Sequence, residues 1–193
     1  MKSLLAQKIG MTRSFDAKGQ VVPITEVKLD TSVVTTVKTL AKDGYRAYQV
    51  GFGNKVKSKL HLFLREFRII KDEDEPKIGD AIQADHLFQP GDLVSVTAIS
   101  KGKGFASVIK KYGFKGGPRT HGQSDRERAP GSVGQTTTPG RVYKGKRMAG
   151  RMGGKQITVR NLQVFKIDMT NNVMSLTGAI PGRKNTLLKI TKV

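Results

Sequence analysis

The sequence contains no cysteine, no tryptophan and few acidic residues. The lack of cysteine excludes disulfides, thiolate zinc sites, iron–sulfur ligation and cysteine nucleophiles. No apolar run approaches the ~20 residues that a membrane-spanning helix needs. The apolar patch near Met1 is too short for a secretory signal. We therefore expect a soluble, intracellular protein.

Positive charge dominates what is present. The 193 residues include 35 Lys and Arg against 15 Asp and Glu, a formal net charge of +20. Such a charge opposes compaction unless a polyanion neutralises it. Nucleic acid is the first candidate partner, and an anionic membrane surface is the second.

The charge is concentrated in one part of the chain. Residues 101–160 hold 15 basic and 2 acidic residues, a net charge of +13, together with 13 of the 22 glycines. Within them, Gly116 to Lys155 contains no Leu, Ile or Phe. This segment cannot bury enough apolar surface to offset the conformational entropy that its backbone loses on ordering, roughly 1–2 kcal/mol per residue. Two interpretations remain, a flexible linker or an arm that orders on nucleic acid. The Arg- and Lys-rich composition with spaced prolines favours the arm.

The flanking segments alternate between apolar and polar residues with the period of two that is typical of strands. The expected strands are Val21–Leu29, Val33–Leu40, Arg46–Phe52, Leu93–Ile99, Gln156–Ile167, Val173–Ile180 and Leu187–Ile190. Helical spacing predicts two short helices, Lys59–Phe67 and Phe105–Tyr112, the second ending at Gly113. Many short strands separated by turns indicate a mainly β barrel or sandwich.

The strands on both sides of the basic segment must share one core, because the last 33 residues are too few to fold alone. We expect a discontinuous globular domain of residues 1–112 and 156–193. The arm, residues 113–155, is inserted between its strands.

Enzyme chemistry has little support in the sequence. His61, His86 and His121 match no metal-ligand spacing, although His121 lies in the arm, where phosphate contact or stacking is an alternative to an ordinary loop role. The acidic run Asp72–Glu75 lacks the spacing of a calcium loop. The segment Gly178–Lys184 is not a phosphate loop. An RNA-modifying activity is the one enzymatic alternative, and we expect no catalytic residue and no metal site.

The composition of the arm predicts its target. The arginine guanidinium group can bind two phosphate oxygens at once, and glycines allow the protein backbone to approach the nucleic acid closely. Tyr143 is the one aromatic residue of Gly116–Lys155, which disfavours a single-strand stacking platform. No recognition helix or zinc finger is visible, so we expect a folded RNA. Asp125 and Glu127 either pair with arginines or contact RNA through Mg²⁺. The segment Lys101–Phe105 is either a tight turn or a phosphate contact, and both interpretations stay open.

Several motifs resemble the large-subunit ribosomal protein three family of bacterial type. They occur in order along almost the whole chain, and together they are specific. They are Lys8-Ile-Gly-Met-Thr12, Asp43-Gly-Tyr-Arg-Ala47, Ser100-Lys-Gly-Lys-Gly-Phe105, His121-Gly-Gln-Ser124, Arg128 to Gly140, Lys144 to Gly153 and Gly178-Ala-Ile-Pro-Gly182.

The resemblance implies a closed β-barrel of the translation-protein type, as in elongation factors, with a long basic extension and one or two short helices. It implies a structural constituent of the large ribosomal subunit, not an enzyme. Such a protein binds the 3′-terminal domain of the large-subunit ribosomal RNA early in assembly, and its extension reaches toward the peptidyl transferase centre.

The implied partners are this RNA and neighbouring ribosomal proteins, without a membrane, a small-molecule substrate or a cofactor other than Mg²⁺ bound through the RNA. A bacterial cytoplasmic ribosome is favoured over an organellar one. The alternative function is a non-ribosomal architectural nucleic-acid binder. Thr137 stands where many bacterial relatives carry a methylated glutamine, so the resemblance does not imply that modification here.

Charge pattern and resemblance together predict a set of RNA-binding residues. They are Lys8, Arg13, Lys101, Lys103, Lys110, Lys111, Lys115, Arg119, His121, Arg126, Arg128, Ser132, Gln135, Thr136, Thr137, Thr138, Arg141, Lys144, Lys146, Arg147, Arg151 and Lys155.

Overall fold

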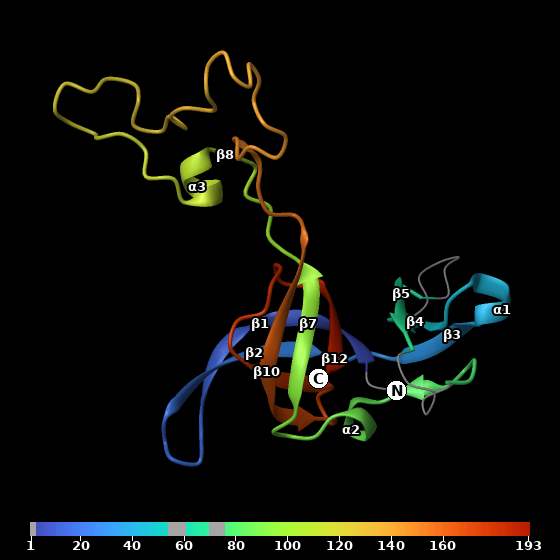
Figure 1. Ribbon diagram of the computed structural model, residues 1–193. Helices are drawn as coiled ribbons and strands as arrows, with labels where there is room; N and C mark the ends of the chain where they lie inside the picture. The colour runs from blue at the N-terminus through green and yellow to red at the C-terminus, as the bar shows by residue number, and fades with distance from the viewer. Residues whose placement is uncertain (1–2, 54–60, 70–75) are drawn as a thin grey trace. The chain divides into compact units, whose positions relative to one another are not determined.

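The computed structural model describes residues 3–53, 61–69 and 76–193. It is mainly β, as predicted, with three short helices among these residues (Figure 1). Contacts divide the chain into two compact units. One comprises Met1–Ser100 and Gln156–Val193 and is called the β unit here; the other, Lys101–Lys155, is called the basic unit.

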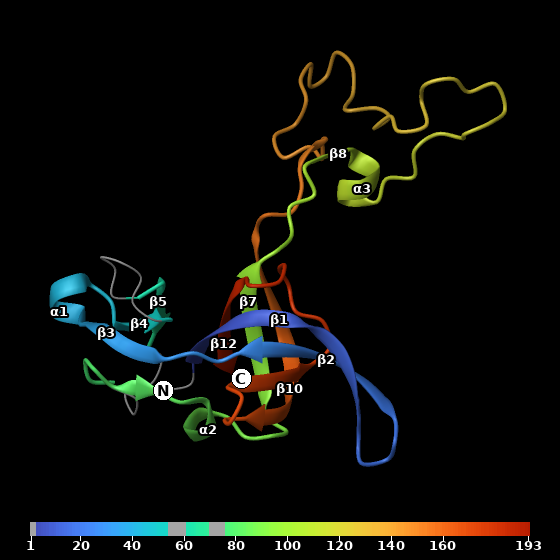
Figure 2. The same cartoon turned by 180° about the vertical axis from the view of Figure 1, so that it is seen from behind.

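Six strands of the β unit pair in a ring. They are β1 (Ser3–Phe15), β2 (Val21–Lys28), β7 (Leu93–Ile99), β10 (Gln156–Asp168), β11 (Val173–Thr177) and β12 (Leu187–Lys192). Their order is β1-β12-β7-β10-β11-β2, and β2 pairs with β1 again; all the pairs are antiparallel (Figure 2). Strands from before and after the basic unit are therefore direct neighbours, β7 with β10 and β12.

A second sheet has the strand order β5-β4-β3-β6. Its strands are β3 (Ser32–Lys38), β4 (Ala47–Phe52), β5 (Phe63–Arg68) and β6 (Ala81–Ile82). Two short helices accompany it in sequence, α1 (Leu40–Asp43) and α2 (Ala84–Leu87). β3 and β4 are antiparallel neighbours, and Gly44 between them is in the left-handed conformation, where glycine has no steric penalty.

The core follows the alternation of the strands. In β7, Val94, Val96 and Ala98 are buried, Ser95 and Thr97 between them are half-buried, and Leu93 and Ile99 at the two ends are exposed. Successive side chains of a strand point to opposite faces, so one face of β7 lies in the core. The buried side chains of both sheets form a single hydrophobic cluster, in which the Tyr48 and Phe67 rings stack with centroids 5.5 Å apart.

Lys189 connects the ring of strands to the second sheet. Its Nζ donates a 2.6 Å hydrogen bond to the backbone oxygen of Glu66 and lies 4.3 Å from the Phe67 ring centroid. Burial lowers the pKa of this lysine, because a desolvated ammonium is less stable than a hydrated one.

One helix predicted from the sequence is a strand in the structure. The helix expected at Lys59–Phe67 is strand β5 over the described residues Phe63–Arg68; Lys59 and Leu60 lie outside the described residues. Phe63 and Phe67 are four residues apart, a spacing that fits both one face of a helix and one face of a strand. The segment forms a strand because its backbone pairs with β4.

Strand β1 was not predicted from the sequence. Ser3, Leu4, Leu5 and Ala6 are all buried, so this end of the strand shows no alternation. β1 contacts β4 of the second sheet in addition to its partners in the ring, which explains why both of its faces are covered. The predicted acidic loop Asp72–Glu75 lies outside the described residues.

Candidate nucleic-acid interface

The basic unit has many charges and almost no core. It holds 14 Lys and Arg against the two carboxylates Asp125 and Glu127, so it carries a net +12 of the chain's +20. Of its residues, all of which the structure describes, Ala106 and Val108 alone are buried. Its charged side chains are consequently available to a partner.

A short ladder holds the two ends of the basic unit together. Strand β8 (Phe105–Ala106) pairs with β9 (Gly150–Arg151), and backbone hydrogen bonds of 2.9 Å join Lys103 to Met152 and Met152 to Gly104. A Cβ at Gly153 would collide with the backbone oxygen of Lys101. The unit therefore begins at Lys101, whereas the predicted arm begins at Gly113.

Helix α3 (Val108–Tyr112) follows the ladder and ends at Gly113, as the sequence predicts. Gly113 is left-handed with φ 75°, and its N–H donates to the carbonyl of Ile109 at 2.8 Å. The predicted helix start at Phe105 is wrong, since Phe105 and Ala106 form strand β8.

A second close contact between two backbone segments lies beyond α3. The Gly117 N–H donates to the Glu127 carbonyl at 3.1 Å, and Cβ atoms at Gly116 and Gly117 would meet the backbone of Glu127 and Arg126. Glycine is needed here because the two chain segments touch through their backbones. The contact closes residues 116–127 into a loop.

Side-chain contacts orient some of the cations. Arg128 donates from Nη2 to the Ser107 hydroxyl at 3.0 Å. The Lys111 ammonium and the Arg147 guanidinium lie 5.1 and 5.8 Å from the Tyr112 ring centroid, within cation–π range. These contacts connect α3 to residues far from it in sequence.

The turn around Ser132 to Arg141 has few internal contacts. The Ser132 hydroxyl donates to the Gly134 carbonyl at 2.8 Å, and the Gly140 N–H donates to the Thr136 carbonyl at 3.1 Å. The peptide bond before Pro139 is cis. The threonines 136–138 and Arg141 are exposed, and the turn encloses an open hollow.

One of the two carboxylates has an arginine partner. Glu127 accepts a 2.7 Å hydrogen bond from Arg119 Nε, and both side chains are exposed. Asp125 accepts a 3.3 Å hydrogen bond from Ser124. The expected pairing is thus present for Glu127. Across the residues that the structure describes, no group of three or more His, Asp and Glu is placed to hold a metal.

The predicted RNA-binding residues fall into two groups. Lys8 and Arg13 belong to β1 of the β unit, and all the others belong to the basic unit. Lys8 is half-buried, and its Nζ donates to the carbonyls of Ile180 and Gly182 at 2.5 and 3.2 Å. Its ammonium is engaged within the β unit, whereas Arg13 is exposed.

Within the predicted basic-unit group, Lys111 is half-buried, whereas the rest are exposed. The exposed members are Lys101, Lys103, Lys110, Lys115, Arg119, His121, Arg126, Arg128, Ser132, Gln135, Thr136, Thr137, Thr138, Arg141, Lys144, Lys146, Arg147, Arg151 and Lys155. The ladder brings Lys101, Lys103 and Arg151 into one region.

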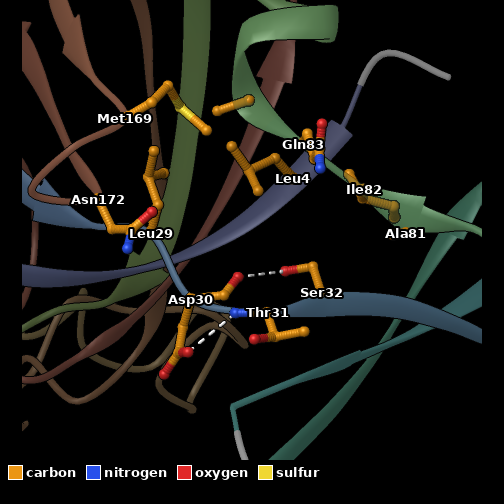
Figure 3. A pocket seen from close by; sticks show the side chains of 11 residues that line it. Leu4, Leu29, Asp30, Thr31, Ser32, Ala81, Ile82, Gln83, Met169 and Asn172 are labelled. Atoms are coloured by element: carbon orange, nitrogen blue, oxygen red, sulfur yellow. Dashed lines mark hydrogen bonds between the residues drawn. The ribbon is translucent and has the colours of Figure 1, made fainter.

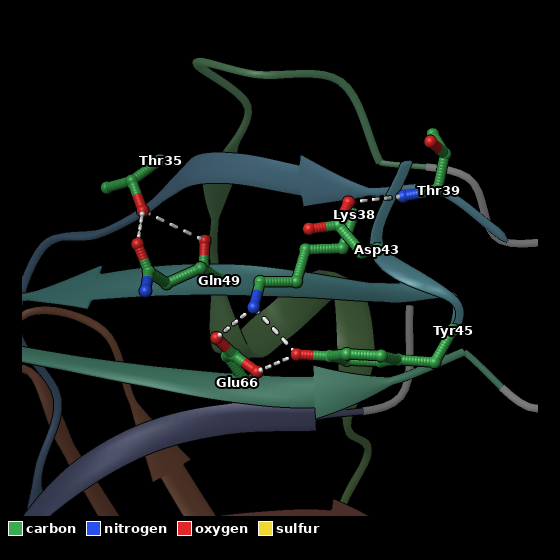
Figure 4. Close-up of polar contacts among 7 residues, drawn as sticks. All are labelled: Thr35, Lys38, Thr39, Asp43, Tyr45, Gln49 and Glu66. Atoms are coloured by element: carbon green, nitrogen blue, oxygen red, sulfur yellow. Dashed lines mark hydrogen bonds and ion pairs between the residues drawn. The ribbon is translucent and has the colours of Figure 1, made fainter. Parts of the chain in front are cut away.

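A polar cluster of the β unit lies on the second sheet (Figure 4). Lys38 donates to the Tyr45 hydroxyl at 2.6 Å and pairs with Glu66 at 3.0 Å, and Tyr45 donates to Glu66 at 3.1 Å. The hydrogen bonds from Lys38 and Tyr45 hold the pKa of Glu66 below its usual range, and those to Tyr45 and Glu66 raise the pKa of Lys38. Every group has a partner, which indicates a structural role.

A cleft in the β unit offers no catalytic group either. It is lined by residues of both sheets, among them Leu4 and Ile82, and by the turn residue Met169, and Figure 3 shows Asp30 among the lining side chains. The Asp30 carboxylate accepts from the Thr31 N–H at 2.9 Å, and its backbone oxygen accepts from Ser32 at 3.3 Å. Among the described residues that line the cleft there is no histidine, lysine or second carboxylate.

Two aromatic residues of the basic unit are exposed against expectation. Helical spacing predicted Phe105 and Tyr112 within one short helix with an apolar face. In the structure Phe105 is 81% exposed and Tyr112 is 38% exposed. The Gly-Lys-Gly run directly before Phe105 was the sequence signal that this residue stands outside the helix, whose apolar spacing begins at Val108.

None of the described helices has both the length and the apolar character that crossing a bilayer requires.

Comparison with known proteins agrees with the motifs. The family model for ribosomal protein L3 matches residues 72–173. The large ribosomal subunit protein uL3 of Herpetosiphon aurantiacus is 45% identical over 206 residues, covering 100% of this chain and 96% of that protein. The uL3 protein of Desulfotalea psychrophila is 46% identical over 202 residues, covering 97% of this chain and 96% of that protein. The uL3 protein of Chlorobium limicola is 41% identical over 208 residues, covering 100% and 99%. The family predicted from the motifs is confirmed, and the chain belongs to the ribosomal protein L3 family.

Proposed function

We propose that this protein is a structural constituent of the large ribosomal subunit and binds ribosomal RNA through its basic unit. The observation that carries the proposal is the combination of a net +12 charge with only two buried residues in Lys101–Lys155. A segment that cannot form a core of its own gains most from a polyanion that neutralises it. Family membership points to ribosomal RNA as that polyanion.

The chemistry of binding is phosphate neutralisation by exposed side chains. Arginine presents a planar fork that bonds two phosphate oxygens at once, and Arg126, Arg128, Arg141, Arg147 and Arg151 are all exposed. Each neutralised phosphate releases counterions, so the affinity falls steeply as salt rises. Lys8 is left out of the proposed contact set, because its ammonium already has two carbonyl partners.

Ribosomal protein L3 is a structural family, and the chain is not an enzyme. The bacterial relatives favour a ribosome of the bacterial cytoplasm as its location. The architectural alternative, a non-ribosomal nucleic-acid binder, gains no support from these relatives.

Three finer features belong to the same proposal. The complete ring of strand pairings supports a closed barrel of the translation-protein type for the β unit. The division of the chain into two compact units supports a basic arm inserted between strands of this domain. The first residue of the arm is then Lys101 instead of Gly113. The RNA target is the 3′-terminal domain of the large-subunit RNA, and the turn Ser132–Arg141 reaches toward the peptidyl transferase centre; these two points depend on the family resemblance.

The test is binding of the full chain to two transcripts of equal length, one from the 3′-terminal domain and one from the 5′ domain of the large-subunit RNA. Affinity is measured from 50 to 400 mM salt. We expect tighter binding to the 3′ transcript and a log–log slope that reports roughly 6–10 phosphate contacts. Equal affinity for both transcripts, or an affinity that does not change with salt, contradicts the proposal.

A further inference from the structure

Phe105 is the most exposed large apolar side chain among the described residues, at 81%. Its neighbour Ala106 is 3% exposed. Both belong to β8, where successive side chains point to opposite faces. The short ladder with β9 therefore places Ala106 inward and presents the Phe105 ring to the surroundings.

Cationic residues flank Phe105 in the ladder and in the chain. Arg151 lies directly opposite Phe105 in the ladder, at a position whose side chains are within contact range of each other. Lys101 and Lys103 precede Phe105 in the chain and are exposed. The two carboxylates of the unit are elsewhere in sequence, and one of them is paired with Arg119.

The backbone beside the ring is open. Cβ atoms built at Gly102 and Gly104 would find no neighbouring atom within 4 Å, and Gly104 is left-handed with φ +67°. A bulky ligand can approach the main chain here without meeting a side chain.

We propose that Phe105 and Arg151 form a stacking site for one unpaired nucleobase of the bound RNA. The base lies on the Phe105 ring, and the Arg151 guanidinium binds the phosphate of the same or the next nucleotide. An aromatic ring stacks on any base, since every base has a π-face. RNA supplies a flat apolar surface and a negative charge together, whereas an apolar protein pocket would desolvate Arg151 and Lys103 without neutralising them. The inference rests on the proposed function.

The first experiment compares substitutions of Phe105 in the full chain, with the 3′-terminal-domain transcript as the probe. Phe105→Ala is expected to weaken binding about 5- to 150-fold, the range for loss of one base–aromatic stack. Phe105→Leu keeps an apolar side chain without a π-face and is expected to weaken binding as well, whereas Phe105→Tyr binds within about twofold of the unaltered chain.

The salt dependence separates stacking from charge. Phe105→Ala removes no phosphate contact, so the log–log salt slope is expected to stay unchanged, while Arg151→Gln reduces the slope by about 1. Phe15→Ala is the matched control, because Phe15 is also an exposed strand phenylalanine, at 62%, but belongs to the β unit. It is expected to leave binding unchanged.

A photocrosslinker identifies the occupant directly. With p-benzoylphenylalanine at position 105, reconstituted large subunits are expected to yield an adduct to one nucleotide of the RNA; an adduct to a protein overturns the inference. Equal binding by Phe105→Ala and the unaltered chain, or full binding by Phe105→Leu, also overturns it while the proposed function stands. Failure of the unaltered chain to bind the transcript overturns both.

Discussion

The β unit buries side chains completely, as Val27, Met174 and Leu188 show with 0% exposure, whereas the basic unit buries only Ala106 and Val108. The β unit holds two sheets around one hydrophobic cluster. The basic unit is held by a two-residue ladder, a five-residue helix and a few backbone contacts between glycines and facing chain segments. The difference teaches that one chain contains a region stabilised by its own core and a region that has almost no core of its own.

The largest effect is expected from neutralising the basic unit. Replacing Arg128, Arg141, Arg147 and Arg151 by Gln should weaken RNA binding roughly a thousand-fold at 0.1 M salt and lower the salt slope by about 4, one for each lost contact. Filter binding at several salt concentrations measures both quantities.

The matched control removes four exposed cations of the β unit. Replacing Lys18, Lys28, Arg65 and Lys77 by Gln changes the net charge equally and should leave the slope nearly unchanged. Equal losses in both variants would show that net charge alone, and not the basic unit, determines binding.

The next effect concerns the core. Leu188 on β12 is 0% exposed, so Leu188→Ala should lower the free energy of unfolding by about 2–5 kcal/mol through lost burial and a residual cavity. Val142→Ala in the basic unit, where Val142 is 45% exposed, should change it by less than about 0.5 kcal/mol. Urea denaturation followed by circular dichroism measures both. Comparable losses would mean that the basic unit contributes to the same cooperative core.

A smaller, local effect is expected at the ladder of the basic unit. Gly153 is left-handed with φ +71°, and an added Cβ would collide with the Lys101 carbonyl, so Gly153→Ala should open the ladder. Hydrogen exchange at the Lys103 and Met152 amides, which donate across it, should become faster.

Gly145→Ala is the control for this prediction. Gly145 is also left-handed, at φ +82°, so both variants share the backbone strain of an alanine in that conformation. The Cβ position of Gly145 has open space around it, so Gly145→Ala adds no collision. Unchanged exchange in Gly153→Ala would show that the ladder does not hold the two ends together.

The smallest effect is a pH dependence confined to the β unit. Lys192 donates to Asp92 at 2.5 Å and the Gln89 N–H donates at 2.8 Å, and these bonds hold the pKa of Asp92 below its usual range. A carboxyl whose pKa is lowered by folding stabilises the protein above its ordinary pKa, and the contribution is lost as the pH falls through the lowered value.

Asp92→Asn should therefore be less stable than the unaltered chain at pH 6, and the two should converge as the pH falls below about 4. Thermal unfolding between pH 2 and 7 measures the difference. A constant difference over this range would exclude the ionisation of Asp92 as the cause.

The sequence by itself determined the mainly β class of fold and the place of the basic unit. Strand alternation in Leu93–Ile99 and Gln156–Asp168, and charge without apolar residues in Gly116–Lys155, are local properties, so they can be read directly from the chain. The motifs likewise identified the family without the structure, and the comparisons confirm it.

The tertiary structure alone decided features that depend on contacts between distant residues. β1 shows no alternation at its start because a second sheet covers its other face, and the four-residue spacing of Phe63 and Phe67 became a strand only through pairing with β4. The exposure of Phe105 follows from a ladder to Arg151, forty-six positions later in the chain. Local composition sets which conformations and charges a segment has, but only long-range pairing determines which of its side chains are buried and which face a partner.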